Sequence, residues 1–411
     1  MLSKHPLLTH TRHLIALLVL AGCVPLAWAQ AVPQTLGQAV DAAWARWPEA
    51  SALPARQAEA QAGLDQARNL TPGPASVSLN HLSDRFNQNL GRREWEVEVA
   101  TPLWLPGQRA ARQAWASQAA AEVEARQALI KLQVAADVRE AWWALALARE
   151  GAQLARQRLE TAQALERSVQ RRFKTGDLAR LDANLAQTER LAAQAEVLDA
   201  DVAVQQAQQA YRLLVGAEPP AVLPAEPATG VAPDRPMHPR LQAWQAAAEL
   251  ARSRLDVVSA SRREAPELAV RWTTQRSDGT TPYDQAVGLK VTVPLSSSAR
   301  VSQDSAAARA ELAQAETELA QAQARIDQAV QGAQAQWQAA QQQRDLAQQR
   351  LTLTDDSLRL AQRSFELGEA SLPDLMRARA AAHEAQAWFK RQDVACALAW
   401  SRLRQAQGVS P

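Results

Sequence analysis

The chain of 411 residues contains little cysteine, little glycine and few aromatic side chains. With only two cysteines, Cys23 and Cys396, it has no disulfide framework, and we expect Cys396 to be a small buried residue of a helix. Alanine, glutamine, arginine, glutamate and leucine are abundant instead. This composition is typical of long helices, and it argues against two or three ordinary compact domains.

Sequence motifs for catalysis and for cofactor binding are also missing. Beyond the N-terminal segment the histidines are His81, His238 and His383, which are too far apart in sequence to suggest a metal site. The chain has no phosphate-binding loop and no nucleophile elbow. We therefore expect neither an enzyme nor a bound cofactor or metal ion.

Residues 1–29 have the features of a signal peptide. Lys4 and Arg12 precede an apolar run, and small residues lead up to Ala29, where we expect cleavage. An alternative signal overlaps this site, because Leu-Ala-Gly before Cys23 forms a lipobox. Cleavage before Cys23 would leave a lipid anchor on that residue.

The mature chain has no surplus of either charge. The whole sequence carries 45 basic and 43 acidic residues, and the signal peptide contains two of the basic ones, so 45 − 2 = 43 remain against 43. This balance gives no indication of nucleic-acid binding. The negative mean hydropathy argues against a membrane protein built of many spanning helices.

A short turn between long helical stretches occurs twice. Phe173 and Gly176 of the first copy correspond to Phe365 and Gly368 of the second, 192 positions later. The same spacing relates aspartates, prolines and glycines elsewhere without gaps, which predicts a tandem duplication. We expect repeats at 30–216 and 239–411, joined by a proline-rich linker at 217–238.

Each repeat contains two segments in which apolar and polar residues alternate. This period of two is typical of strands with one face in an apolar environment and one face in water. In one segment Trp95 and its alternate neighbours are apolar, whereas the residues between them are glutamates. The strands are predicted at 75–82, 94–101, 267–274 and 286–293.

The segments after the strand pairs are predicted to be very long helices. No proline occurs from residue 108 to 172, and 65 helical residues would span roughly 100 Å at about 1.5 Å each. Four strands cannot close a membrane barrel, and an open sheet edge cannot face lipid. If the strands lie in a membrane, the chain must therefore oligomerise. The long helices would then extend from the barrel and form a conduit.

Taken together, these features resemble the TolC-like family of outer-membrane efflux proteins over nearly the whole mature chain. Both turns match its Phe/Tyr-x-x-Gly-x5-Asp-x3-Ala signature, through Phe173 with Gly176 and through Phe365 with Gly368. The short length and compact linkers also resemble the heavy-metal efflux branch of the family.

The resemblance implies a mainly helical fold with a small membrane β part. It implies a homotrimer whose twelve strands form a barrel in outer-membrane lipid and whose helices form a periplasmic tunnel. It further implies a periplasmic adaptor protein and, through it, an inner-membrane pump that we expect to be proton-driven. Small solutes, metal cations among them, would be exported through this assembly.

The candidate functional residues fall into three groups. The turns are expected to dock the adaptor. The acidic positions after the turns are expected to line the tunnel entrance. Asp374 could instead cap a helix, and Arg377 could pair with it. The docking turns are Phe173, Gly176, Asp177, Phe365, Gly368 and Glu369. The entrance residues are Asp182, Asp374 and Arg377. The barrel lumen is expected to contain Glu94, Glu96, Glu98, Arg271 and Lys290.

Two alternative functions remain open from the sequence. The same fold could serve as an outer-membrane exit duct for proteins or peptides, because the transporter upstream determines the cargo. A soluble periplasmic coiled-coil adaptor is a different class of protein, but it would have one long hairpin beside β-rich domains. This chain has two hairpins, with its strands at the opposite end from the turns.

Overall fold

The computed structural model describes residues 33–227, 237–295 and 298–411. The predicted signal peptide, with Cys23 and both cleavage sites, lies outside these ranges, as does part of the predicted linker.

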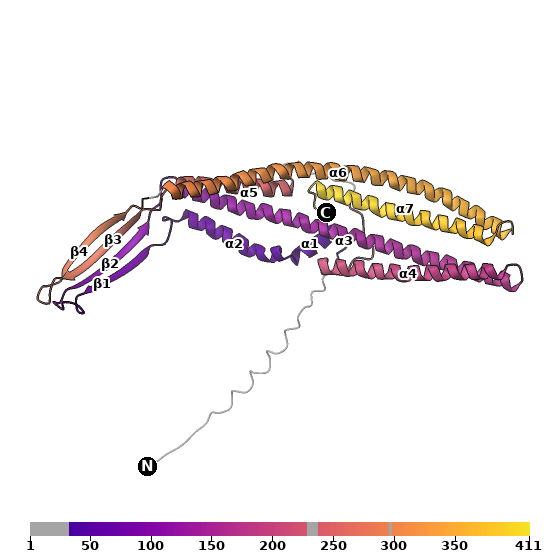
Figure 1. Ribbon diagram of the computed structural model, residues 1–411, viewed down its shortest axis with the longest axis horizontal. Helices are drawn as coiled ribbons and strands as arrows, with labels where there is room; N and C mark the ends of the chain where they lie inside the picture. Colours follow the sequence, from indigo (N-terminus) through magenta and orange to yellow (C-terminus); the bar gives the residue numbers. More distant parts are fainter. Residues whose placement is uncertain (1–32, 228–236, 296–297) are drawn as a thin grey trace, which may run out of the picture.

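The molecule is long and narrow, with a sheet at one end and two helical turns at the other (Figure 1). The C-terminus lies between the two ends, which Figure 1 also shows. The first half contains α1 (Leu36–Ala45), α2 (Pro48–Arg68), β1 (Ser76–Ser83), β2 (Arg93–Pro102), α3 (Gln108–Lys174) and α4 (Arg180–Val215). The second half contains α5 (Pro239–Ala260), β3 (Glu267–Arg276), β4 (Asp284–Thr292), α6 (Ser298–Glu366) and α7 (Leu372–Ala406).

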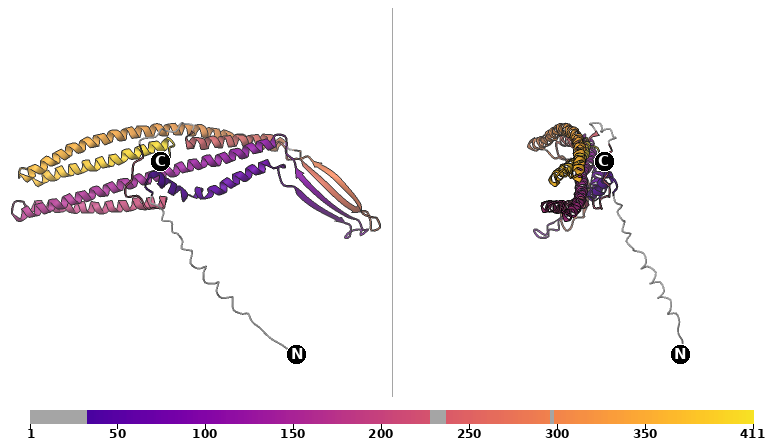
Figure 2. Two further views of the ribbon diagram at one scale, coloured as in Figure 1. Left: turned by 180° about the vertical axis from the view of Figure 1, so that it is seen from behind. Right: turned by 90° about the vertical axis from the view of Figure 1, so that its right-hand side faces the viewer.

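The two longest helices extend along most of the molecule. Helix α3 has 67 residues and α6 has 69, so each is roughly 100 Å long at about 1.5 Å per residue. Helix α3 forms a hairpin with α4, and α6 forms a hairpin with α7. Viewed end on, the helices form a curved layer (Figure 2). None of the described helices combines the length and the apolarity needed to cross a membrane.

The four strands form one antiparallel sheet in the order β1-β2-β3-β4. Strands β1 and β4 are therefore at its edges, and within the described chain each has a partner on one side only. The predicted strand bounds agree with the observed ones to within two residues.

The spacing of 192 does not relate β1 to β3, which are the first strands of the two repeats. This finding corrects the expectation of a repeat without gaps. Val77 pairs with Val99, and Leu268 pairs with Val291. Whereas 291 − 99 = 192, the difference 268 − 77 is 191. A shift of one residue moves a side chain to the other face of a sheet, so this offset keeps apolar residues of both repeats on one face.

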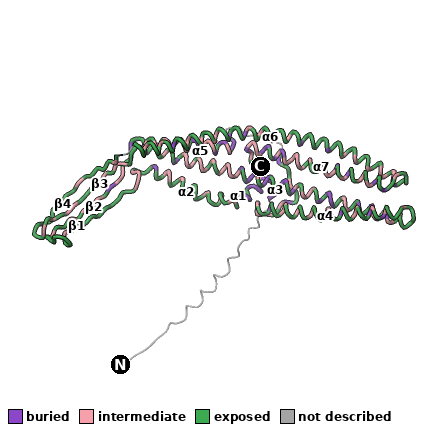
Figure 3. Tube along the Cα trace, in the orientation of Figure 1, coloured by how far each residue is buried: buried purple, intermediate pink, exposed green. Residues whose placement is uncertain are grey.

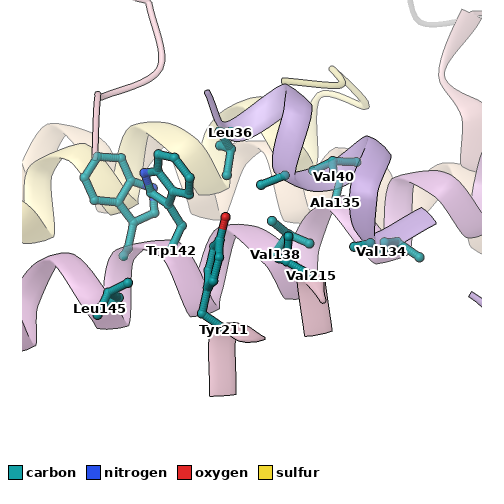
Figure 4. Packing of buried hydrophobic residues seen from close by; sticks show 12 residues of the cluster. Leu36, Val40, Val134, Ala135, Val138, Trp142, Leu145, Tyr211 and Val215 are labelled. Atoms are coloured by element: carbon teal, nitrogen blue, oxygen red, sulfur yellow. The ribbon is translucent and has the colours of Figure 1, made fainter. Parts of the chain in front are cut away.

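The main core lies near the middle of the long axis, where buried residues concentrate (Figure 3). Leu36 and Val40 of α1 pack against Val138 and Trp142 of α3 and against Tyr211 of α4, as Figure 4 shows. Helix α1 ends at Ala45, and Pro48 is the first residue of α2. Burial raises the pKa of the Tyr211 phenol to about 12.

A buried ion pair attaches the start of the linker to this core. The Arg139 side chain, 1% exposed, forms a bidentate pair with Glu226, whose side chain is 4% exposed. Its Nε and Nη2 atoms lie 2.9 and 3.0 Å from the carboxylate oxygens. Ser401 of α7 also donates to Glu226, and Arg139 donates to Gln405 and to the Val409 carbonyl. The network therefore joins α3, the linker and the C-terminal segment.

Candidate functional site

The sheet has one apolar face and one polar face, because side chains alternate along each strand. Nine apolar side chains on the apolar face are exposed to solvent, and their exposed fractions range from 40% at Trp95 to 77% at Leu289. The strand register places the following residues on this apolar face: Val77, Leu79, His81, Trp95, Val97, Val99, Leu268, Val270, Trp272, Val287, Leu289 and Val291. An exposed apolar surface of this kind marks a site of contact with lipid or with another protein.

All five predicted lumen residues share the opposite, polar face. Glu98 accepts from Lys290 at 3.1 Å, and a carboxylate oxygen of Glu96 lies 3.6 Å from Arg271. A Glu94 oxygen lies 4.0 Å from Arg92. The polar face of the strands carries five carboxylates (Glu94, Glu96, Glu98, Glu267 and Asp284) against the two cations Arg271 and Lys290. Its net charge is therefore negative even after ion pairing.

The two turns at the far end have the same backbone geometry. The φ angles of Gly176 and Gly368 are 85° and 80°, values that favour glycine because other residues are strained there. The Gly176 amide donates to the Phe173 carbonyl at 3.1 Å, and the Gly368 amide donates to the Phe365 carbonyl at 3.2 Å. Because an added Cβ would meet nothing within 4 Å at either glycine, backbone conformation rather than crowding accounts for the residue type.

The two phenylalanines differ, although the sequence assigned both to docking. Phe173 is 37% exposed at the tip, whereas Phe365 is only 7% exposed. Phe365 packs between the two hairpins against a cluster that includes Val169 and Leu375, and the Arg172 guanidinium lies 4.9 Å from its ring centroid. Phe365 thus holds the hairpins together and is not an accessible docking residue within this chain. Asp177, Gly368 and Glu369 are exposed as a docking surface requires.

The predicted entrance aspartates occupy the third position of their helices. Asp182 accepts from the Ala179 amide at 3.1 Å, and Asp374 accepts from the Ser371 hydroxyl at 2.6 Å. Ser371, rather than Asp374, is the N-cap of α7, which corrects the alternative that Asp374 itself caps the helix. Arg377 pairs with Asp374, as their spacing suggested. The hydrogen bond from Ser371, and then the charge of Arg377, lower the pKa of Asp374.

A cavity between the hairpins, lined by both apolar and charged side chains, was not anticipated from the sequence. It has a volume of about 180 Å³ and is lined by Arg158, Glu189, Arg379 and His383, among others. Arg158 lies 2.9 Å from Glu189, and burial lowers the pKa of His383. These residues come from three helices, α3, α4 and α7, so no local motif could have revealed the cavity. Among residues 33–227, 237–295 and 298–411, no group of three or more His, Cys, Asp or Glu side chains has the arrangement of a metal site.

Comparison with known proteins bears on both halves of the fold. Residues 237–409 match the family model described as outer membrane efflux protein, whereas no curated protein sequence gives a match. VceC, an outer membrane protein of Vibrio cholerae, is 17% identical, with a TM-score of 0.72, and the match covers 91% of this chain and 96% of that one.

Two further solved structures are similar. The CmeC outer membrane channel of Campylobacter jejuni is 15% identical over 91% of this chain and 86% of that one, with a TM-score of 0.71. The open-state MtrE outer membrane channel of Neisseria gonorrhoeae is 16% identical over 91% and 89%, with a TM-score of 0.72. At such identities the structures show a shared fold alone. With the family match, they confirm the predicted resemblance and agree with the predicted location in the outer membrane.

Proposed function

We propose, from the premise that residues 237–409 belong to the outer membrane efflux protein family, that this chain is the outer-membrane channel of a tripartite efflux system. The observation that carries the proposal is the sheet, whose apolar face is exposed and whose polar face holds paired charges. An isolated sheet of this kind would be unstable in water. It fits a barrel wall with lipid outside and water inside.

Closure of the barrel requires further copies of the chain. Lipid cannot hydrogen-bond the free edges of β1 and β4, so each edge needs a strand from a neighbouring chain. Three chains supply twelve strands, and their helices would then continue below the barrel as a tunnel. A homotrimer is therefore the assembly that we propose.

Exposed leucines on the helices support the same assembly. Leu346, Leu353 and Leu360 recur every seven residues along α6, and all three are exposed. Leu191 and Leu198 of α4 are exposed at the same spacing. Leucines at a spacing of seven form the seam between helices in coiled coils. In the proposed trimer, α6 of one chain packs beside α4 of the next and covers both stripes.

The turns form the end of the tunnel that is furthest from the membrane. This position suits them for docking a periplasmic adaptor, which links the channel to an inner-membrane pump. In the first turn the exposed Lys174 and Arg180 outnumber the exposed Asp177, whereas the second turn has the exposed Glu366 and Glu369. The two turns therefore have opposite charge. The proposed docking surface therefore alternates in charge around the ring.

The proposed cargo is small solutes, and the acidic polar face favours cations among them. Five carboxylates against two cations in each chain would give a trimer a lumen of negative potential. Metal cations fit this electrostatic preference. The inner-membrane partner sets the final choice of substrate.

Cysteine labelling in intact outer membranes tests the two-faced sheet. In a Cys396→Ala background, cysteines are placed one at a time at residues 286 to 291 of β4 and treated with a membrane-impermeant charged maleimide. We expect positions 286, 288 and 290 to react and positions 287, 289 and 291 to be protected by lipid. Equal labelling at all six positions, or recovery of the protein in the soluble fraction, would overturn the proposed function.

A further inference from the structure

The charged residues of the four strands are divided unequally between the two faces. Seven lie on the polar face: Glu94, Glu96, Glu98, Glu267, Asp284, Arg271 and Lys290. Only two, Arg93 and Arg276, are placed by the register on the apolar face. A charge on a surface that faces lipid is costly, so this pair needs an explanation.

The two arginines also lie directly opposite each other in neighbouring strands. Arg93 of β2 pairs in register with Arg276 of β3. Like charges at directly opposed positions destabilise a sheet. Arg276 donates from Nε to the Gly91 carbonyl at 3.0 Å, and its guanidinium lies 5.1 Å from the Tyr283 ring centroid. Neither contact supplies a negative charge.

Nearby carboxylates do not compensate the pair. Asp84 accepts from the Leu90 amide, Asp278 accepts from Thr280 and Thr281 within its own turn, and Asp284 lies on the polar face. The Arg93 side chain is exposed, and it forms no side-chain hydrogen bond or ion pair with any residue in the part of the chain that the structure describes. The pair is therefore a concentrated positive charge without an acidic partner among the described residues.

The position of the pair indicates what could balance this charge. Arg93 and Arg276 occupy the row nearest the loops, and the next row contains His81 stacked on Trp95, with ring centroids 3.9 Å apart. Aromatic residues lie at the level of the headgroups in membrane proteins. Arginine side chains bind phosphate oxygens in a bidentate manner. A lipid phosphate at this level would meet both guanidinium groups.

We propose that Arg93 and Arg276 form a binding site for the phosphate-bearing headgroup of a membrane lipid in the leaflet at the loop end of the sheet. The acyl chains of that lipid lie along the apolar face below, against Trp95 and Trp272. The proposal rests on the proposed function, because it requires the apolar face to be in a bilayer. It adds that the barrel selects lipids by the phosphate they carry.

Lipid retention by the purified full-length protein tests the site. The probes are bisphosphorylated lipid A and the same lipid after chemical dephosphorylation, with bound copies counted by native mass spectrometry. The variants are Arg93→Gln and Arg276→Gln, and Arg271→Gln is the matched control, because it removes an arginine of the same strand, β3, from the polar face. We expect each test variant to weaken binding of the phosphorylated lipid on the order of tenfold. The control should leave binding unchanged.

A second readout depends on the sign of a stability change. In an uncharged detergent, Arg93→Gln relieves the repulsion between the two arginines and should raise the midpoint of thermal unfolding of the sheet. With bisphosphorylated lipid A the same variant should lower it. An arginine with a merely structural role would shift the midpoint in the same direction under both conditions, and that result would overturn the site.

The outcomes separate this inference from the proposed function. Failure of the protein to enter lipid bilayers would contradict both. Entry into bilayers with equal retention of phosphorylated and dephosphorylated lipid would contradict only the phosphate site. Equal loss of binding in Arg271→Gln would also contradict it, because a general effect of charge would then explain the result.

Discussion

The buried pair between Arg139 and Glu226 gives the sharpest quantitative prediction of stability. The Arg139 side chain is only 1% exposed, and replacement of Glu226 by alanine removes the carboxylate that pairs with its charge. Removing one partner of a buried ion pair costs about 3–5 kcal/mol, because the remaining charge stays desolvated. The network that holds the start of the linker against α3 and α7 should loosen with it.

The chain offers a control pair that also uses helix α3. Arg402 of α7 and Glu140 of α3 also form a bidentate pair, with both N···O distances 2.7 Å. Their side chains are 49% and 52% exposed, so water solvates either charge when its partner is removed. Arg402→Ala should therefore cost only about 0.2–1 kcal/mol. The two pairs differ mainly in burial, which isolates desolvation as the cause.

Hydrogen exchange of the backbone amides in residues 132–145 measures the free energy of local opening without assuming two-state unfolding. We expect a large loss of protection in Glu226→Ala and a small one in Arg402→Ala. The double variant Arg139→Met with Glu226→Met should recover most of the loss, because no buried charge remains unpaired. A Glu226→Ala effect below about 1 kcal/mol, or one equal to the control, would refute the reasoning.

Three further predictions concern the channel surfaces. Glu96→Gln together with Glu98→Gln should reduce the preference for cations in planar-bilayer recordings, since it removes two of the five carboxylates of the polar face; an unchanged reversal potential would contradict this. Gly368→Val should cost about 1–3 kcal/mol in the turn, because φ there is 80°, and it should abolish adaptor cross-linking while heat-resistant trimers persist; normal cross-linking would exclude the second turn from docking. Leu353→Asp should dissociate the trimer on native gels, whereas Thr352→Asp, one position along α6, is the control that should leave it intact.

The sequence was most informative where a local pattern carries the structure. Alternation in residues 94–101 predicted both the strand and its two faces, because the side-chain period of a strand is two. Repetition of Phe-x-x-Gly predicted both turns, because the backbone angle at the glycine restricts the residue type. These features depend on neighbours within a few residues.

Features that depend on distant contacts were not predictable. Phe173 and Phe365 occupy equivalent turns, and only the packing of one hairpin on the other buries Phe365. Arg139 and Glu226 are 87 positions apart, and no local pattern connects them. The offset of 191 between the first strands became visible only from their pairing, because the prolines before them keep the spacing of 192.

Disulfide cross-linking between chains tests the central claim, closure of one barrel by three copies, most directly. In the closed barrel, β4 of one chain would pair with β1 of the next, as β2 pairs with β3 within the chain. Val99 of β2 pairs with Val270 of β3. The residue equivalent to Val99 in β4 is Val291 (99 + 192), and the residue equivalent to Val270 in β1 is Leu79 (270 − 191). Directly opposed residues of antiparallel strands have Cα separations of about 4.5–5.5 Å, which a disulfide can span. In a Cys396→Ala background, Leu79→Cys with Val291→Cys should therefore form a covalent ring of three chains. Leu79→Cys with Thr292→Cys places the thiols on opposite faces and should leave separate chains. The account predicts a single three-chain species in the first case, and the absence of cross-links or a ladder beyond three chains would contradict it.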